Sequence, residues 1–172
     1  MPEKLMFLSP EWVHEAVRVV QSARGKDEEF RRLTSGYSLN LVYVVTDVPS
    51  RLKKIYHSEQ IILFIQLDKG TVKNFEILTK LPVEKIDFTI RSSYSVVKQI
   101  FLEQLSATTA FMNRQLKVEP FSMVYRRPRF TAKSIIVGNM ILKFCRLIPT
   151  DYVLNMNSNE PRLLQKAPSE GC

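Results

Sequence analysis

The sequence predicts an α+β fold in which helices cover one face of a five-stranded mixed sheet. Three observations predict it. Four short runs with strand-like composition precede the main helices, an order typical of α+β domains. Two of these runs are joined by residues 68–70, a short turn that contains the glycine a tight hairpin needs. The segment 86–101 changes halfway from the two-residue period of a strand to the spacing of a helix face.

The first predicted helix begins at Ser9 and Pro10. A serine hydroxyl can accept a hydrogen bond from a free amide of the first turn, and proline is favoured at the first helical position. The charged segment 26–33 is predicted to form a short second helix that buries Phe30 and Leu33. The apolar stripe of the first helix consists of Trp12, Val13, Ala16, Val17, Val20 and Ala23.

Five segments have the composition or the period of strands. Residues 37–45 are β-branched and aromatic and lie between turn residues. Residues 60–67 and 71–78 form the two arms of the predicted hairpin. In residues 86–90 apolar side chains alternate with polar ones, as in a strand with one buried face. Residues 115–119 supply a short fifth strand, with two apolar side chains on one side.

Helices are predicted again after the fourth strand. Ser92 and Ser93 lie where the period changes, so a hydroxyl can cap a helix predicted over 94–105. Ser106 is placed to cap a further short helix over 107–112. Both helices follow the sheet directly, so we expect them to pack on the same face.

The C-terminal third is predicted to contain a loop, a helix and a tail. The basic, proline-bearing segment 120–130 is expected to be a loop. Residues 131–148 are apolar almost all round, but their unbroken apolar runs are shorter than the ~20 residues of a membrane span. We therefore expect a helix that packs over the core. Residues 1–150 are expected to form the domain, and residues 151–172 a polar tail.

Composition limits the class of protein. The chain has 172 residues, 45% of them hydrophobic, and its 25 basic and 17 acidic residues give a net charge of +8. Such a chain suits one globular domain with a sizeable core. The positive charge favours an anionic partner, namely a lipid surface, an acidic ligand or nucleic acid, although it also serves plain solubility. Two cysteines and no secretory segment lead us to expect a cytoplasmic protein.

Groups that could carry catalysis or bind a metal are scarce. His14 lies among apolar residues of the first helix, and His57 lies in a polar approach to a strand. No cluster of cysteines or carboxylates with metal-ligand spacing accompanies either histidine. The five glycines are scattered, so no phosphate-binding loop is predicted. Cys145 lies in an apolar helix, where a thiol is ordinarily inert. We therefore expect no enzymatic activity, no metal and no cofactor.

Four stretches of the sequence point together to one known family. They are the helix start FLSPEW, the hairpin ILFIQLDKGTVKNFEIL, the strand-to-helix joint DFTIRSSYSVVKQIF, and TAFMNRQLKVE, a helix end that leads into a short strand. In this order they resemble the sterol carrier protein two family of small lipid-binding domains, over roughly residues 7–119. The chain departs from that family where glycines usually flank the last strand and where residues 120–130 are inserted, so a sterol ligand is not implied.

The resemblance implies helices on one side of the sheet and an enclosed apolar tunnel that takes sterols, fatty acyl chains or acyl-CoA. We therefore expect a non-enzymatic protein that binds or carries a fatty acyl chain, an isoprenoid or another lipid. The side chains expected to line the cavity are Phe88, Ile90, Val97, Phe101, Leu105, Phe111, Met112, Met140 and Phe144.

The residues themselves support this expectation more weakly. Ile86, Phe88 and Ile90 of the fourth strand are expected to face the apolar side of the following helix. Methionine and phenylalanine side chains suit an adaptable pocket. The same residues could instead form an ordinary filled core, because protein interiors are close-packed.

Basic residues gather where the predicted loop meets the last helix, and the cluster consists of Arg126, Arg127, Arg129 and Lys133. Near an anionic membrane each such charge contributes ~1 kcal/mol, enough for transient contact while a lipid is exchanged. The plain alternative is a solvated basic loop.

Two other classes of function stay open. The basic face could bind nucleic acid, with Tyr37, Tyr43 or Phe64 stacking on bases. We do not expect this partner, because the aromatic residues follow no RNA-binding motif. The chain could also be a structural or dimerisation module with a solid core.

Overall fold

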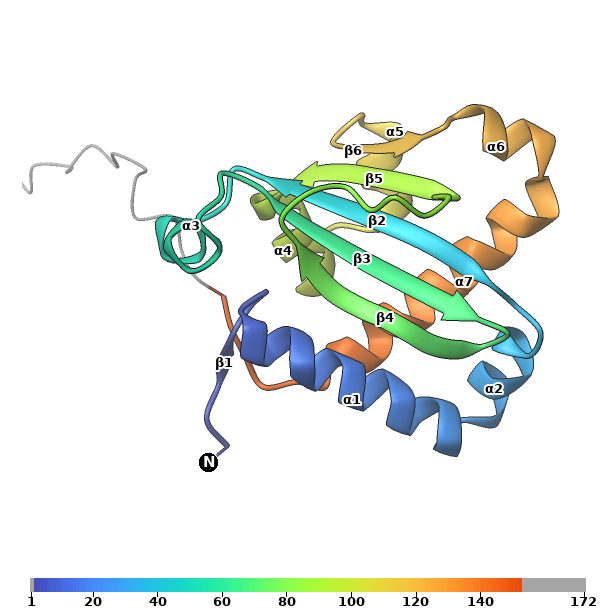
Figure 1. Cartoon of the computed structure of the whole chain (residues 1–172), viewed down its shortest axis with the longest axis horizontal. Coiled ribbons are helices and arrows are strands. Elements are labelled where there is room, and N and C mark those ends of the chain that lie inside the picture. The colour runs from blue at the N-terminus through green and yellow to red at the C-terminus, as the bar shows by residue number, and fades with distance from the viewer. Residues whose placement is uncertain (1, 153–172) are drawn as a thin grey trace, which may run out of the picture.

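The central feature of the structure is a five-stranded mixed sheet. The computed structural model describes residues 2–152. The strands lie in the order β4-β3-β2-β5-β6, in which β2 and β5 are parallel and all other neighbours are antiparallel (Figure 1). The predicted α+β fold and its five strands are confirmed. Their bounds are Leu39–Thr46 for β2, Ile61–Asp68 for β3, Thr71–Leu78 for β4, Phe88–Ser93 for β5 and Leu116–Glu119 for β6.

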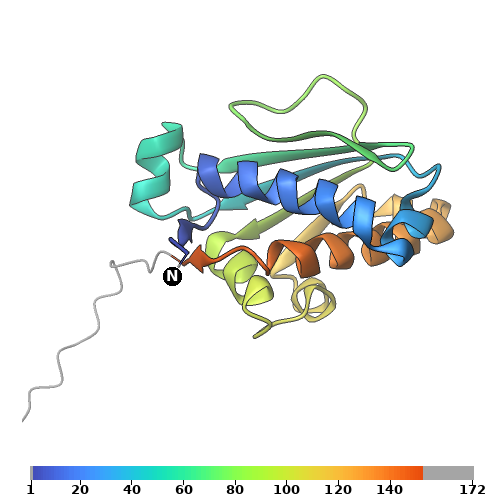
Figure 2. The ribbon, with the colours of Figure 1, turned by 90° about the horizontal axis from the view of Figure 1, so that it is seen from below.

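Helices cover one face of this sheet, while the loop of residues 79–87 lies on the opposite side (Figure 2). The helix α1 runs beside β4 and packs on α7, and α2 packs on both α1 and α7. The prediction of helices on one face is therefore confirmed. The covering helices are α1 (Pro10–Lys26), α2 (Glu28–Thr34), α4 (Tyr94–Phe101), α5 (Ala107–Met112) and α7 (Pro128–Cys145).

Serine hydroxyl groups begin three of the helices, as the sequence predicts. The Ser9 Oγ accepts a hydrogen bond from the Trp12 amide at 3.2 Å at the start of α1. The Ser93 Oγ accepts one from the Val96 amide at 3.3 Å, where β5 passes into α4. Ser106 caps α5 in the same way. Each hydroxyl pairs an amide that has no acceptor within its own helix, so each start is fixed locally.

The hairpin between β3 and β4 is closed by Lys69 and Gly70, whose φ angles are +49° and +83°. Glycine is required here for two reasons. The left-handed conformation strains a residue with a side chain, and a Cβ at Gly70 would lie 2.3 Å from the carbonyl oxygen of Thr34 at the end of α2. The turn therefore also sets how closely α2 approaches the sheet.

The main core lies between the sheet and the helices α1, α2 and α7. Phe7, Trp12 and Phe30 are among its largest fully buried side chains. The ring centre of Phe7 lies 5.0 Å from that of Trp12 and 4.7 Å from that of Phe101. One aromatic residue outside the helices thus joins α1 to the end of α4, which holds the two helices in place over the sheet.

Two helices differ in extent from the prediction. The first was missed altogether, because residues 51–60, expected to be a polar approach to a strand, contain most of the helix α3 (Ser50–Tyr56). The helix predicted over 94–105 is α4 and ends at Phe101, because Glu103 takes a φ of +59° that no helix can continue through.

The segment 120–130 is not the loop that its proline and charge predict. It contains the short helix α6 (Ser122–Arg126) and the first turn of α7. Pro128 stands at the start of α7, where the missing amide hydrogen costs nothing and the fixed φ suits a helix. The basic residues of this segment therefore lie on and between two helices.

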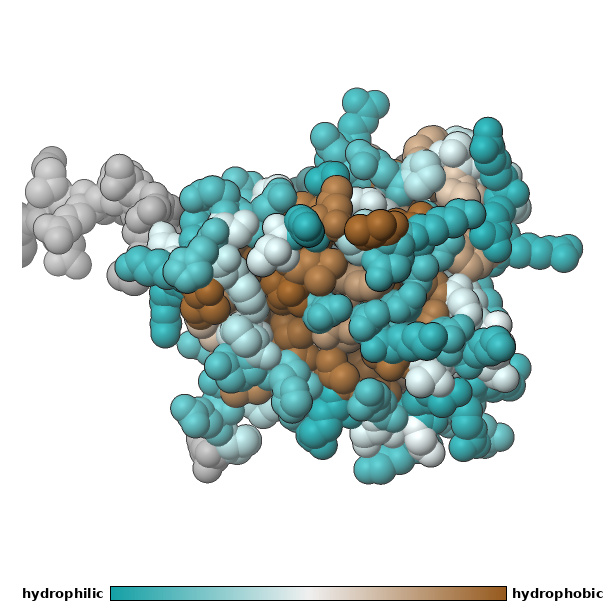
Figure 3. Space-filling model, viewed as in Figure 1, coloured by the Kyte–Doolittle hydropathy of each residue, from teal (hydrophilic) through white to brown (hydrophobic). Residues whose placement is uncertain are grey.

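The opposite face of the sheet carries a second, smaller apolar cluster. Val42, Val44, Ile62 and Phe64 are buried there, and Figure 3 shows the apolar surface over β2 and β3. Ile86 packs against this cluster. The expectation that Ile86 faces the helices is therefore wrong, because β5 begins only at Phe88 and the preceding loop crosses the outer face.

Two short strands, which the sequence did not reveal, join the ends of the described chain. The strand β1 (Leu5–Met6) pairs in parallel with β7 (Thr150–Asp151). Among residues 2–152, no helix combines the length and the apolar character that a membrane crossing needs. Of the predicted tail over 151–172, all but the first two residues lie outside the described part of the chain.

Candidate functional site

A row of incompletely buried side chains runs from the central strand β2 to the edge strand β6, on the face that the helices cover. Tyr43 of β2 lies opposite Ile90 of β5, and Ile90 lies opposite Val118 of β6. All three side chains are partly buried, as is Leu41 beside them on the central strand β2. Residues in the centre of a helix-covered sheet are ordinarily sealed by the helices. Here the helices leave part of this row uncovered.

An apolar groove lies at the end of this row. It has a volume of about 370 Å³, opens to solvent, and includes Val118, the last residue of the row. This volume is within the range of ~300–1,000 Å³ that is usual for ligand pockets. Two charged side chains, those of Arg114 and Lys117, also line the groove. The complete lining is Phe111, Met112, Arg114, Leu116, Lys117, Val118 and Phe121.

Exposed apolar side chains extend the groove onto the surface. Met112 is 73% exposed and Tyr125 is 72% exposed. Phe121 connects this surface to the groove through ring contacts. Its ring centre lies 6.2 Å from that of Phe111 and 5.4 Å from that of Tyr125. A cluster of large exposed apolar groups of this kind is characteristic of a binding surface rather than of ordinary protein surface.

The basic cluster predicted at the surface lies next to this apolar area, on α6 and the start of α7. Arg126, Arg127 and Arg129 are exposed, and Lys133 is partly buried. The Arg127 guanidinium lies 4.2 Å from the centre of the Phe130 ring, and the Lys133 ammonium 5.0 Å from that of Tyr37. Within residues 2–152, none of the four basic residues forms an ion pair. Their charge is therefore available to an anionic partner.

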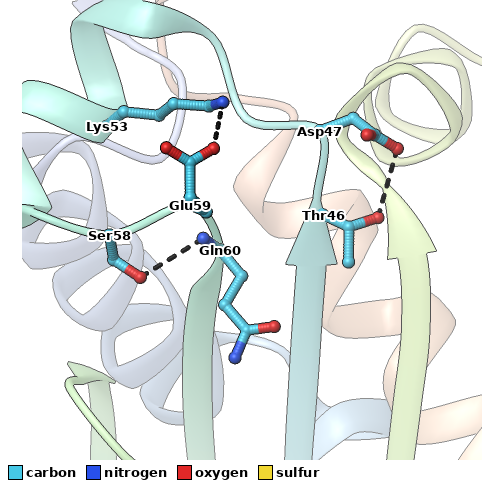
Figure 4. A network of polar contacts seen from close by, with 6 residues as sticks. All are labelled: Thr46, Asp47, Lys53, Ser58, Glu59 and Gln60. Carbon is cyan, nitrogen blue, oxygen red and sulfur yellow. Dashed lines mark hydrogen bonds and ion pairs between the residues drawn. The ribbon is translucent and has the colours of Figure 1, made fainter.

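The basic helix α3 differs in this respect. There Lys53 forms an ion pair with Glu59, and the backbone N–H of Gln60 donates a hydrogen bond of 3.2 Å to the Ser58 hydroxyl (Figure 4). The ion pair neutralises the charge of Lys53, which is one of the basic residues of α3. It also lies at the other end of the sheet from α6 (Figure 1).

A pair of hydroxyl groups lies beside the row of partly buried side chains. The Tyr43 and Ser92 oxygens are 2.7 Å apart, within hydrogen-bond distance, and Ser92 is 6% exposed. Burial raises the pKa of Tyr43 to about 12. The phenol therefore stays protonated and neutral at physiological pH, which makes it a hydrogen-bond donor and not a base.

The nine predicted cavity residues lie in three environments. Phe88, Val97 and Phe144 are buried in the main core, and Phe101 and Met140 are partly buried against it. Ile90, Leu105 and Phe111 pack around the smaller cluster under α4 and α5. Met112 projects outward, and of the nine only Phe111 and Met112 line the groove.

Several residues of the site were not predicted from the sequence. Leu41 was read only as part of a strand, and Tyr43 was considered only as a residue that could stack on bases. Their partial burial depends on helices far away in the chain. Phe121 and Tyr125 lie four residues apart, which is the spacing of one helix face and could have indicated α6. The proline and arginines of residues 126–129, which indicated a loop, concealed that signal.

A second depression of about 350 Å³ lies between the end of α4 and β7. Arg146 lines it, and its guanidinium donates hydrogen bonds to the backbone oxygens of Ile100 and Phe101 at 2.8 and 3.2 Å. The same side chain pairs with Glu103 at 3.5 Å. These hydrogen bonds are accepted by backbone carbonyl groups at the C-terminal end of the α4 helix, so Arg146 has a structural role there.

The two histidines do not line the groove beside β6. His14 and His57 are both exposed and lie on α1 and at the end of α3. Within the part of the chain that the structure describes, no three His, Cys, Asp or Glu side chains are grouped to hold a metal ion.

We expect the Cys145 thiol to resist alkylation by iodoacetamide at pH 8 in the folded protein. It is 2% exposed, and burial raises its pKa to about 12, so almost no reactive thiolate is present at that pH. Peptide mass spectrometry on a Cys172→Ser variant measures the modification, with urea-unfolded protein as the positive control. Modification of the folded protein as fast as that of the unfolded one would contradict the expectation.

Comparisons with known proteins agree on one family. The model of the SCP-2 sterol transfer family matches residues 24–119. The solution structure of TT1886 from Thermus thermophilus, a conserved hypothetical protein, is similar with a TM-score of 0.62 at 15% identity, over 87% of this chain and 94% of that one. The crystal structure of a sterol carrier protein 2 is similar with a TM-score of 0.61 at 14% identity, over 83% and 98%. No curated protein matches the sequence.

Proposed function

We propose that this chain, which belongs to the SCP-2 sterol transfer family, is a non-enzymatic carrier of one apolar ligand. The ligand would be a fatty acyl chain, an isoprenoid or another lipid. In this proposal its apolar part lies between the sheet and the helices, and it enters through the groove beside β6. Family membership supports lipid binding or transfer in general, and the geometry supports the particular location.

The observation that carries the proposal is the row formed by Tyr43, Ile90 and Val118. Tyr43 and Ile90 lie on inner strands of a sheet face that helices cover, yet they are only partly buried, and Val118 continues the row to the edge strand β6. The row leads into a groove whose wall is largely apolar. A continuous apolar surface that the protein does not cover itself is the surface that a hydrocarbon chain can cover.

Burial of the ligand supplies enough free energy for this role. A chain of ~16 carbons gains on the order of 12 kcal/mol from burial at ~0.8 kcal/mol per methylene. Much of this gain is offset by the translational and conformational freedom that the ligand loses. The remainder is compatible with useful affinity without any charged contact.

The basic cluster gives the carrier a means of loading. Arg126 and Arg129 are exposed and unpaired by any described carboxylate, and they lie next to the exposed side chains of Phe121 and Tyr125. Cationic and aromatic groups side by side suit the headgroup region of an anionic membrane. We propose that this surface rests on the membrane while a lipid passes through the groove.

Analysis of what the purified protein carries tests the proposal directly. We expect native mass spectrometry to detect a protein–lipid adduct, and we expect extraction with organic solvent to release a lipid in nearly equimolar amount. After extraction, the protein should bind diphenylhexatriene, a hydrocarbon that fluoresces only in apolar surroundings. Absence of both the adduct and diphenylhexatriene binding would refute the proposal and favour a structural module with a solid core.

Nucleic-acid binding by stacking receives less support from the structure. Of the three aromatic residues considered for it, Tyr37 and Phe64 are buried, and Tyr43 lies under the helices. None of them offers the open ring face that a base needs.

A further inference from the structure

We infer that the Tyr43–Ser92 pair donates a hydrogen bond to an oxygen atom of the bound ligand. This inference rests on the proposed function and specifies its ligand class. The ligand would be an apolar molecule that bears an acceptor oxygen, such as a carbonyl, ether, hydroxyl or carboxyl oxygen. A pure hydrocarbon would bind less well than its apolar surface predicts.

The Tyr43–Ser92 pair has one hydroxyl hydrogen more than its own hydrogen bond uses. Two hydroxyl groups carry two donor hydrogens, and the single bond between Tyr43 and Ser92 uses one of them. Neither oxygen has a further hydrogen-bond partner among residues 2–152. One O–H group is therefore left over, in a place where Ser92 is almost wholly buried. A buried donor without an acceptor destabilises a protein, so a second acceptor is expected there.

The other Tyr–Ser pair of the fold shows what a complete arrangement looks like. The Tyr37 and Ser134 oxygens are 2.6 Å apart, and the Ser134 hydroxyl donates to the Phe130 backbone oxygen at 2.8 Å. Here both donor hydrogens are used within the protein. The two pairs contain the same residue types. Within the described part of the chain, the Tyr37–Ser134 pair has an acceptor for its second hydrogen and the Tyr43–Ser92 pair has none.

The position of the incomplete pair points to the ligand. Tyr43 belongs to the row of partly buried side chains, and Ser92 lies directly opposite Leu116 in the pairing of β5 with β6. Leu116 lines the groove. The unused O–H group therefore lies one strand inward from the groove wall, where a polar atom of a ligand would meet it.

The test compares two ligands of nearly equal size, tridecane and 2-tridecanone. The ketone can accept a hydrogen bond but cannot donate one, as the inference requires. Displacement of diphenylhexatriene gives the dissociation constant of each. In the Tyr43→Phe/Ser92→Ala double variant, we expect the ratio of the ketone constant to the alkane constant to rise by about three- to tenfold over wild type, the value of one neutral hydrogen bond.

The double variant removes both partners, so it leaves no unpaired polar atom and should fold. The matched control is the Tyr37→Phe/Ser134→Ala double variant, for which the ratio should stay at the wild-type value. An unchanged ratio in the first variant, or an equal rise in the control, would overturn the inference. If neither tridecane nor the ketone binds the wild type, the proposed function fails as well.

An infrared measurement keeps the test independent of the variants. The carbonyl stretch of 2-tridecanone bound to the wild-type protein should lie below its frequency in dodecane, because a hydrogen bond weakens the C=O bond. A bound ketone that absorbs at the dodecane frequency would overturn the inference, even if the double variant does not fold.

Discussion

Replacement of Ile90 by tryptophan is expected to weaken binding of diphenylhexatriene and of lipid more than tenfold while the protein stays folded. Ile90 lies in the middle of the partly buried row, between Tyr43 and Val118. If the row faces space that the ligand occupies, the larger indole fills that space instead. Titration of the probe by fluorescence, together with urea unfolding followed by circular dichroism, measures both quantities.

The stability measurement distinguishes a hollow interior from a solid one. In a filled core the extra atoms of tryptophan would cost ~1–3 kcal/mol or more, whereas beside open space they should cost less than ~1 kcal/mol. Ala110 is fully buried in the same cluster as Ile90, so Ala110→Leu provides the matched control for overpacking. Ile90→Trp would refute the carrier proposal if it destabilised the protein as much as the control and left probe binding intact.

Reversal of two charges, Arg126→Glu with Arg129→Glu, should weaken binding to anionic vesicles by on the order of 100-fold. Each basic group near an anionic surface contributes ~1 kcal/mol, and each glutamate adds repulsion on top of that loss. Arg127 is left unchanged because its guanidinium packs on the Phe130 ring. Co-sedimentation with vesicles of phosphatidylcholine and phosphatidylserine measures the effect, which should shrink as salt screens the charges.

A control with the same change in net charge separates local docking from general attraction. Arg51→Glu with Lys54→Glu alters the exposed charges of α3, at the other end of the sheet. We expect this variant to retain most of its vesicle binding. Equal losses in the two variants would show that net charge alone governs the interaction, and the proposed membrane surface would then be wrong.

These two predictions test separate parts of the proposed cycle. Ile90 lies beneath the helices and does not belong to the basic surface, whereas Arg126 and Arg129 lie outside the apolar row. A carrier should therefore lose ligand binding in one variant and membrane binding in the other. Lipid transfer between vesicles should fail in both, because it needs the two steps in sequence.

The secondary structure was largely determined by local sequence. Alternation of apolar and polar residues specified β5, the turn at Lys69 and Gly70 specified the hairpin, and serine caps specified the starts of α1, α4 and α5. Such signals act over a few residues, through backbone hydrogen bonds and allowed φ angles, so they can be read directly. Where a local signal was ambiguous, as at Pro128, the element was missed.

The groove and the partly buried row were decided by tertiary structure. Whether Tyr43 and Ile90 are fully buried depends on where α4, α5 and α7 pack on the sheet. These helices lie at different separations from the two residues along the chain, so no local pattern encodes their packing. A strand pattern tells which side of a strand is apolar, but not whether a helix covers it. For the same reason Met112, predicted as cavity lining, is found facing outward at the mouth of the groove.

The sequence by itself thus determined the five strands of the main sheet, the principal helices, their order and the resemblance to a lipid-binding family, because each of these is carried by neighbouring residues. Only the tertiary structure decided how completely the faces meet and which hydroxyl groups find partners. The two Tyr–Ser pairs show the difference, since they contain the same residue types. The Ser134 hydroxyl lies on α7 and donates to the Phe130 backbone oxygen of that helix. Ser92 lies on the strand β5 and has no second hydrogen-bond partner among residues 2–152, because backbone geometry places the acceptors.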